Sequence, residues 1–212
     1  MDLLWVDLVA NPRFHYLPIY SSRFGRYFCS SELNESNTPY DSKMLNESPL
    51  MNAASTLHQL TRGTPHERAQ AAEYLAQQGP DAAYAASELT AACGDNAEIS
   101  HWAVAALEEL GPPPASAIDA LATLAQSQEP LTAYWAVTLL GRAGRDALEH
   151  QGVIADLLEQ SPDLALREKA AWSLGRMRAN SLEATQALQQ AAQSPKNRLS
   201  RIATKSLQQT QT

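Results

Sequence analysis

A repeat of about 33 residues constrains this chain more than any other feature of its sequence. Five leucines recur at spacings of 32, 33, 34 and 33 residues, and an alanine stands four residues before each of them. These anchor leucines are Leu75, Leu107, Leu140, Leu174 and Leu207, and the alanines are Ala71, Ala103, Ala136, Ala170 and Ala203. Residues four apart share one face of a helix, where alanine lets a neighbouring helix approach and leucine fills the space between them. The period therefore predicts an array of similar units that bury their apolar faces against one another.

A second set of apolar positions follows each anchor leucine at a similar offset. One column is Leu89, Leu121, Ile154 and Leu188, and a second column is Ala92, Leu124, Leu157 and Ala191. Each unit is therefore predicted to be a helix A, a short turn and a helix B. Residues 50–62 add a leading helix B, and no helix B follows the last helix A. The predicted fold class is all-α: a right-handed α-solenoid of stacked antiparallel helix pairs, with about four full units and a half-unit at each end.

Glycine, proline and hydroxyl residues mark where these helices are expected to end and begin. A glycine four residues after the anchor predicts a helix C-cap at Gly79, Gly111 and Gly144, whereas the fourth unit carries Arg178 there and needs a different turn. A hydroxyl followed by proline predicts helix starts at Thr64-Pro65, Ser161-Pro162 and Ser194-Pro195. Glu67 is placed to complete a capping box with Thr64.

The helix A segments RAQAAEYLAQQG, HWAVAALEELG, AYWAVTLLGRAG and REKAAWSLGRM carry a family resemblance. They resemble HEAT-like repeats, in particular the short type first associated with phycobilisome lyases, over roughly residues 50–212. The spacing is shorter than the ~40–47 residues of longer HEAT and armadillo units. Tetratricopeptide repeats have a similar length but need aromatic-glycine positions that these units lack. The resemblance implies a scaffold, a lyase subunit or, in a few relatives, an enzyme.

Residues 1–49 differ in composition from the repeat region, residues 50–212. They hold all three phenylalanines and four of the seven tyrosines of the chain, but one alanine. Three interpretations stay open: a weakly ordered or disordered arm whose aromatic residues dock on a partner, a small lid on the repeats, or a mis-assigned start with translation beginning at Met44 or Met51.

The sequence shows no convincing catalytic constellation, and we expect neither a cofactor nor a metal. The iron-dependent hydroxylases that this repeat type resembles carry His-Glu pairs six and five residues before the anchor leucine, where His101 here is followed by Trp102. Cys93 is interpreted as a small apolar filler, and Trp102 and Trp135 as packing residues between successive A helices. The favoured function is a non-catalytic protein-protein interaction scaffold or adaptor. The alternative, which the resemblance implies, is a bilin-lyase-like enzyme subunit.

Two surfaces are predicted to bind a partner. Adjacent turns of a solenoid stack, so we expect a basic ridge suited to carboxylates or phosphates at Arg142, Arg145, Arg176 and Arg178. The alternative interpretation is that Asp146, Glu149 and the carbonyls at helix C-termini neutralise the charge of these arginines, so that the ridge binds no partner. The B helices are expected to line the concave side of the solenoid and to present a polar strip to a partner. The alternative interpretation of this strip is a helix face that is merely solvated. Its residues are Thr123, Gln126, Asp156, Glu159, Gln190 and Gln193.

The net charge and its distribution along the chain limit the classes of partner that we expect. The net charge is −7, which argues against nucleic acid, and residues 50–130 hold ten acidic and two basic residues while residues 131–212 hold seven acidic and ten basic ones. We therefore expect a protein partner with an acidic segment, with self-association between the acidic and basic halves as a further possibility. No apolar run reaches the ~20 residues of a membrane span, and two cysteines make no disulfide framework, so we expect a cytoplasmic protein without membrane contact.

Overall fold

The computed structural model describes residues 52–210, which fold entirely into helices and the turns between them. Residues 52–210 lie within one compact unit, and the predictions for residues 1–49 lie outside the described residues. Ten α-helices follow one another: α1 (Ala53–Arg62), α2 (Pro65–Gln78), α3 (Ala86–Ala92), α4 (Ala97–Glu109), α5 (Ile118–Leu124), α6 (Pro130–Ala143), α7 (Gln151–Gln160), α8 (Leu164–Met177), α9 (Leu182–Ala192) and α10 (Asn197–Thr210). Three 3₁₀ helices join them: η1 (Gly79–Ala85), η2 (Ala115–Ala117) and η3 (Gly144–His150).

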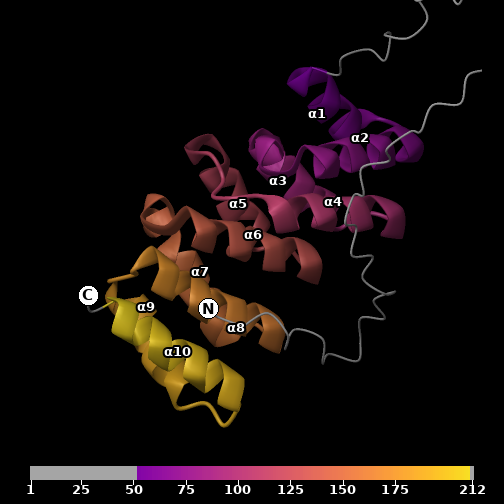
Figure 1. Cartoon of the computed structure of the whole chain (residues 1–212). Helices are drawn as coiled ribbons and strands as arrows, with labels where there is room; N and C mark the ends of the chain where they lie inside the picture. Colours follow the sequence, from indigo (N-terminus) through magenta and orange to yellow (C-terminus); the bar gives the residue numbers. More distant parts are fainter. Residues whose placement is uncertain (1–51, 211–212) are drawn as a thin grey trace, which may run out of the picture. The chain divides into compact units, whose positions relative to one another are not determined.

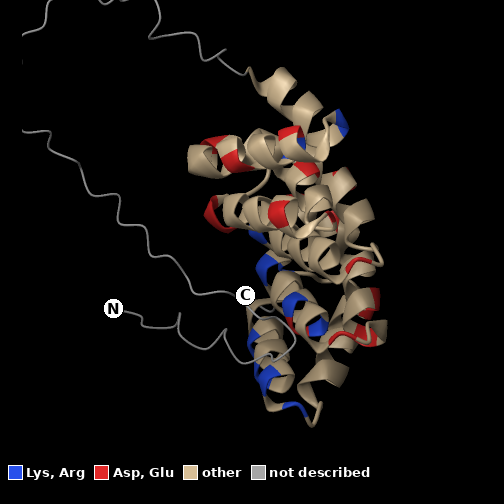
Figure 2. Ribbon diagram, turned by 90° about the vertical axis from the view of Figure 1, so that its right-hand side faces the viewer, with Lys and Arg blue, Asp and Glu red and all other residues tan. Residues whose placement is uncertain are grey.

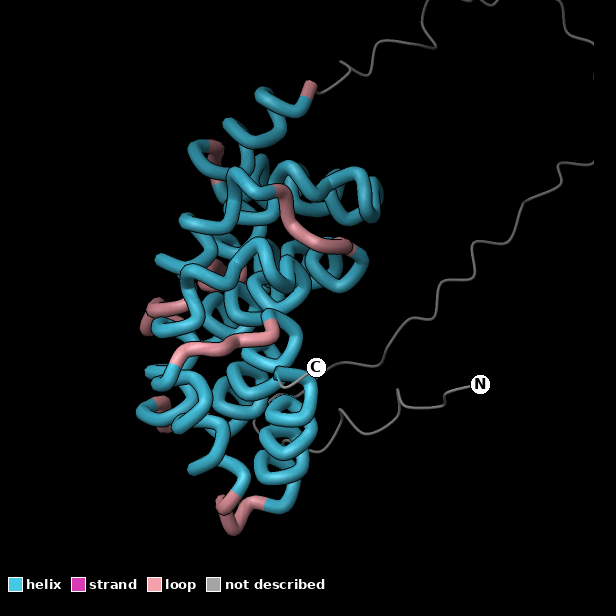
Figure 3. The backbone as a smooth tube through the Cα atoms, turned by 90° about the vertical axis from the view of Figure 1, so that its left-hand side faces the viewer, coloured by secondary structure: helices cyan, strands magenta, loops and turns pink. Residues whose placement is uncertain are grey.

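The α-helices form two layers, as Figures 1 and 3 show. The even-numbered helices are the A helices and the odd-numbered helices are the B helices. Each B helix packs against the A helix that follows it, and neighbours in one layer also pack together, as α6 does with α8 and α7 with α9. Four complete pairs lie between the leading α1 and the trailing α10, which confirms the predicted α-solenoid.

The repeating leucines and alanines form the core between the layers. The first four anchor leucines and all five alanines of the repeat are fully buried, while Leu207 in the last helix is partly exposed. The B-helix residues Leu89, Leu121, Ile154 and Leu188 are also fully buried. Burying one such leucine contributes about 1.5–3 kcal/mol, so the periodic residues dominate the stability of the array.

Two glycines let successive A helices approach closely. A Cβ atom on Gly141 of α6 would lie 2.5 Å from the ring of Trp172 and 2.6 Å from Ser173 Oγ, both on α8. A Cβ atom on Gly175 of α8 would lie 2.5 Å from Ser206 Oγ on α10. Real Cβ atoms do not come this near, so glycine is required at both contacts.

The backbones of α4 and α6 lie farther apart than those of the other successive A helices. Gly141 and Gly175 each follow an anchor leucine directly, and the same place in α4 is occupied by Glu108. On the side of α6 toward α4, the Arg142 guanidinium lies 5.7 Å from the centroid of the Trp135 ring. Glu108 thus stands where the α6–α8 and α8–α10 interfaces have glycine, and the wider space holds Trp135 and Arg142.

The expected helix ends are confirmed in part. Thr64 and Glu67 form the capping box, with Thr64 N donating to Glu67 Oε2 at 2.7 Å, and Gly79 and Gly144 end α2 and α6 with φ of +56° and +62°. The prediction that Gly111 caps the C-terminus of α4 is wrong, because Leu110, one residue earlier, is the C-cap.

The two Ser-Pro starts are also wrong, and for the same reason. Asp163, two residues beyond Ser161, caps α8 with its own carboxylate, and its backbone N–H donates to Ser161 Oγ at 3.2 Å. Ser194 makes the same bond to the N–H of Lys196 at 3.2 Å, and α10 begins at Asn197. Both serines therefore hold the turn before the helix.

Candidate partner-binding surfaces

Three arginines of the predicted basic ridge lie on neighbouring turns with free side chains. Arg145 is in η3, Arg176 is in the last turn of α8 and Arg178 caps that helix. The turns adjoin, because a Cβ atom on Gly144 would lie 3.6 Å from the carbonyl oxygen of Arg176. All three arginines are exposed, and none of their side chains has a hydrogen bond or ion pair with another residue of the described range 52–210. We refer to Arg145, Arg176 and Arg178 as the arginine ridge.

Arg142 does not belong to this ridge, which corrects the sequence interpretation. Its Nη1 donates to the carbonyl oxygen of Leu107 at 2.7 Å and also to that of Leu110. These carbonyls end α4, where a cation also interacts favourably with the helix dipole. Burial lowers the pKa of the Arg142 guanidinium, and Glu108 opposes that shift. Arg142 therefore joins two units. For this residue the alternative interpretation is confirmed, because its charge interacts with the carbonyls at the C-terminus of α4.

Arg178 has an unusual backbone conformation for an arginine. Its φ of +54° and ψ of +48° are left-handed, and it is the one non-glycine residue with positive φ in the described part of the chain. This conformation costs a non-glycine residue about 1–2 kcal/mol. Gly79 and Gly144 occupy the equivalent place in other units, so the arginine stands where glycine would be more stable.

The other predicted neutralising groups do not reach the arginine ridge. Asp146 is exposed and forms no ion pair among residues 52–210, and the Glu149 carboxylate lies 3.6 Å from His150 Nε2. Neither carboxylate therefore pairs with the three guanidiniums of the arginine ridge. Figure 2 shows basic residues gathered over the C-terminal helices.

The six residues of the predicted B-helix strip are all exposed. They are Thr123 and Gln126 at the end of α5, Asp156 and Glu159 on α7, and Gln190 and Gln193 at the end of α9. Thr123 Oγ1 donates to the carbonyl oxygen of Asp119 at 3.1 Å, which is a local bond within one helix. The strip is available to a partner, and its binding role stays a prediction.

A cluster of aromatic and cationic side chains covers α6 and α8. Lys169 Nζ lies 4.9 Å from the centroid of the Tyr134 ring and 5.0 Å from that of Trp172. Burial lowers the pKa of Lys169 to about 8, and the charges of Arg142 and Arg198 act in the same direction. Sequence reasoning missed this site. The available signal was that Lys169 stands in the repeat position of Trp102 and Trp135, three residues before Trp172.

The prediction that the tryptophans pack between A helices is confirmed for Trp135, which is buried, whereas Trp102 is partly exposed.

The interpretation of Cys93 as a small apolar filler is confirmed. Its side chain is buried, Sγ donates to the carbonyl oxygen of Leu89 at 3.5 Å, and burial raises the pKa of the thiol to about 12. A thiol so rarely ionised is a poor nucleophile.

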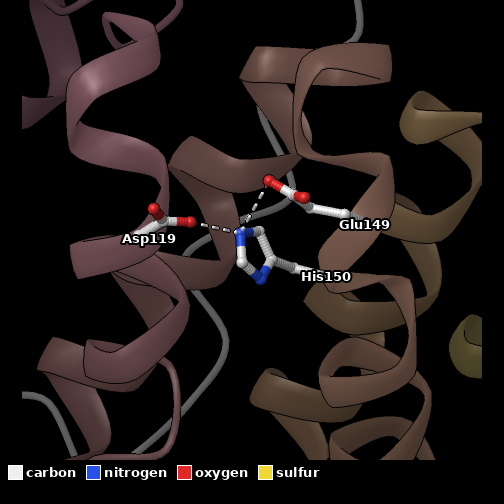
Figure 4. A group of neighbouring side chains, drawn as sticks. All are labelled: Asp119, Glu149 and His150. Carbon is white, nitrogen blue, oxygen red and sulfur yellow. Dashed lines mark hydrogen bonds and ion pairs between the residues drawn. The ribbon is translucent and has the colours of Figure 1, made fainter.

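Asp119, Glu149 and His150 form a small polar group between two units (Figure 4). His150 Nε2 lies 3.0 Å from Asp119 Oδ1, which links η3 to α5. These residue types are ones that bind metals, but the Asp119 and Glu149 side chains are 88% and 73% exposed. An exposed hydrogen bond between neighbouring units accounts for the contact, and we assign no metal to it.

Comparison with known proteins supports the fold. Residues 118–208 match the family model for HEAT repeats. An engineered protein of known structure is 18% identical with a TM-score of 0.54, and the match covers 74% of this chain and 47% of that protein. A second engineered protein is 17% identical with a TM-score of 0.53, covering 75% of this chain and 81% of its own.

A designed armadillo repeat protein in complex with the peptide (KR)4 is 14% identical with a TM-score of 0.54, covering 74% of this chain and 81% of its own. The chain thus spans about half the length of the first engineered protein and most of the other two. No curated protein matches the chain. Within residues 52–210, no helix has the length and apolar character needed to cross a membrane.

Proposed function

This chain is a HEAT-like repeat protein, and from that premise we propose that it is a non-catalytic adaptor that binds an acidic segment of another protein. HEAT and armadillo solenoids present equivalent positions of successive units as one extended surface, which suits them to hold extended partner segments. The arginine ridge is the surface that we assign to the partner.

The observation that carries the proposal is a set of three unpaired guanidiniums on adjoining turns. Guanidinium groups bind carboxylates with two parallel hydrogen bonds, and these three have no competing intramolecular carboxylate among residues 52–210. The left-handed conformation of Arg178 adds weight, because strained backbone at a surface is retained where the side chain has a use. The designed armadillo repeat protein is in complex with a basic peptide, (KR)4, so it supports peptide binding by such a solenoid and not the acidic character of the partner.

Quantitative affinity capture with mass spectrometry tests the proposal. The bait variants are Arg145→Glu, Arg176→Glu and Arg178→Glu combined, and a control with Arg62→Glu, Lys196→Glu and Lys205→Glu combined. Both change the net charge equally, and the control residues are exposed and unpaired within the described chain. We expect a dominant protein partner that is released by salt, lost from the ridge variant and kept by the control. Equal retention by both variants would remove the ridge from the adaptor's function.

A second variant separates binding from stability. Arg178→Gly relieves the left-handed strain, so we expect the free energy of unfolding to rise by about 0.5–1 kcal/mol while partner capture weakens. If Arg178→Gly lowers both quantities, the arginine serves the fold and not the partner.

Three further predictions concern the B-helix strip, self-association and the alternative function. The B-helix strip would add contacts to the partner, and charge reversal at Asp156 and Glu159 tests this separately. Self-association between the acidic and basic halves predicts an elution volume that changes with protein concentration and salt. The bilin-lyase-like alternative predicts that the purified protein takes up free bilin and becomes coloured.

A further inference from the structure

A stripe of three residues runs along α8 up to the arginine ridge. Lys169, Trp172 and Arg176 are spaced at i, i+3 and i+7, so they lie on one face of the helix. With a rise of 1.5 Å per residue, Lys169 and Arg176 are about 10 Å apart along the helix axis. Arg176 is exposed, while Lys169 and Trp172 are partly exposed. We refer to these three residues as the α8 stripe.

Lys169 is a cation without a carboxylate partner. Its ammonium lies between the rings of Tyr134 and Trp172, and no ion pair joins it to another residue of the described range. The nearest carboxylate in sequence, Glu168, is taken by Arg198, whose Nε lies 3.1 Å from Glu168 Oε2. Two rings can hold a cation by its attraction to their faces, but they leave its charge uncompensated.

The charged groups around Lys169 increase this imbalance. Arg142 comes from α6 and Arg198 from α10, and both act on Lys169 as like charges. Tyr134, also from α6, contributes its ring, and Glu168 on α8 is itself largely buried beside Arg198. An incoming carboxylate beside Lys169 would therefore meet an unpaired ammonium with two further cations, Arg142 and Arg198, near it.

Trp172 gives the stripe a rigid apolar centre. Its ring packs against the backbone of α6 at Gly141, where a Cβ atom would lie 2.5 Å from the ring. A partly exposed tryptophan that is held in place suits an apolar side chain of a partner, because little side-chain freedom is lost on binding.

We propose that the α8 stripe is a docking site for a partner segment with two carboxylates about three residues apart and an apolar side chain between them. The spacing follows from geometry, because a partner segment in the polyproline II conformation has three residues per turn and advances about 3.1 Å per residue. Side chains three residues apart then lie on one side of the segment and about 9 Å apart, which is close to the separation of Lys169 and Arg176 along α8. This inference rests on the proposed function, since it describes the partner segment of the same adaptor.

The site makes binding depend on pH in a way that the arginine ridge does not. A carboxylate beside Lys169 favours the ammonium, so the pKa of Lys169 rises on binding and protons are taken up. Affinity is then full below pH 8 and falls as the pH rises above 8, where the unbound lysine is neutral. Guanidinium groups stay charged throughout this range, so contacts with the arginine ridge alone give no such dependence.

Fluorescence anisotropy with two synthetic peptides tests the proposal. One labelled peptide carries the core Glu-Ala-Leu-Glu in a Gly-Ser background, and the other carries the same residues with adjacent glutamates, Glu-Glu-Ala-Leu. We expect the first peptide to bind on the order of tenfold more tightly at pH 7, and its affinity to fall at pH 9.5. Equal affinity for both spacings overturns the proposed motif.

Three variants assign the effect to Lys169. Lys169→Met should weaken the first peptide about tenfold and abolish the pH dependence. Lys169→Arg should retain binding without the pH dependence, and Lys205→Met, an exposed lysine on α10, should behave as the wild type. Wild-type binding by Lys169→Met at both pH values would refute the site.

The variants also separate this inference from the proposed function. If the double variant Arg145→Glu/Arg178→Glu loses binding and Lys169→Met does not, the result supports the arginine ridge and refutes the α8 stripe. Loss in Lys169→Met with no effect of reversing Arg145 and Arg178 refutes the ridge instead.

Discussion

Replacing Gly141 by alanine should destabilise the array, whereas the same change at Gly152 should stabilise it. Both residues are helical glycines, in α6 and α7. Alanine is favoured over glycine inside a helix by about 0.5–1 kcal/mol, which alone makes both substitutions stabilising. The surroundings differ, because a Cβ atom at Gly152 has no atom within 4 Å while one at Gly141 meets Trp172 and Ser173 below 3.0 Å.

The magnitude at Gly141 follows from two contacts. Inserting a methyl group into a filled interface costs about 1–3 kcal/mol. The Ser173 hydroxyl is buried and donates to the carbonyl oxygen of Val137 at 2.7 Å, and displacing it adds about 1–3 kcal/mol. After subtracting the gain in helix propensity, we expect Gly141→Ala to lower the free energy of unfolding by about 1–5 kcal/mol. Gly152→Ala should raise it by up to about 1 kcal/mol.

Urea unfolding followed by circular dichroism measures both changes, and native-state hydrogen exchange of α6 and α8 locates them. Local measurement matters because a repeat array can lose cooperativity between its units. Protection should fall in α6 and α8 of Gly141→Ala. If Gly141→Ala stabilises as much as Gly152→Ala, the close contact of α6 and α8 is refuted.

Four further changes test other parts of the structure. Thr64→Ala removes half of the capping box and should lower the free energy of unfolding by about 1 kcal/mol in urea titrations, and an unchanged midpoint would contradict the cap. Arg142→Met leaves the carbonyls that end α4 without their donor and should cost about 1–3 kcal/mol by the same assay, whereas a stabilised variant would contradict its joining role. Cys93 should resist iodoacetamide in the native state at pH 8 and react after unfolding, because burial raises the pKa of its thiol to about 12; rapid native alkylation, mapped by mass spectrometry, would contradict this. The pKa of Lys169 is about 8 in the folded protein, against 10.5 for an ordinary lysine, so the unfolded chain binds more protons between these values; stability should rise with pH there by at most about 1.4 kcal/mol per unit, and Lys169→Met should abolish the rise.

The repeat made the fold predictable from the sequence. Each anchor leucine is paired with an alanine four residues earlier, so a single pattern indicated the helices, their shared face and the order of the units. Such information is local and repeated five times, which is why the core agrees so closely with the prediction. Exact helix ends were less predictable, because at Ser161 a competing cap two residues later, Asp163, takes the helix start.

The candidate sites depended on contacts between units, which the sequence pattern does not specify. Arg142 and Arg176 hold the same place after their anchor leucines, yet Arg142 turns to the end of α4 and Arg176 remains free. The difference arises in the neighbouring helix, where Glu108 takes the place of a glycine and widens the space between α4 and α6. Lys169 was missed because its two aromatic neighbours come from different helices.

The most direct test of the adaptor is a titration of the labelled Glu-Ala-Leu-Glu peptide with the wild type and the two charge-matched triple variants at 50 and 200 mM salt. We predict that reversing Arg145, Arg176 and Arg178 weakens binding by about tenfold or more at low salt and removes most of its salt dependence. Reversing Arg62, Lys196 and Lys205 should leave the affinity nearly unchanged. Equal weakening by both variants would mean that net charge, and not the arginine ridge, attracts acidic segments, and would contradict the proposed function.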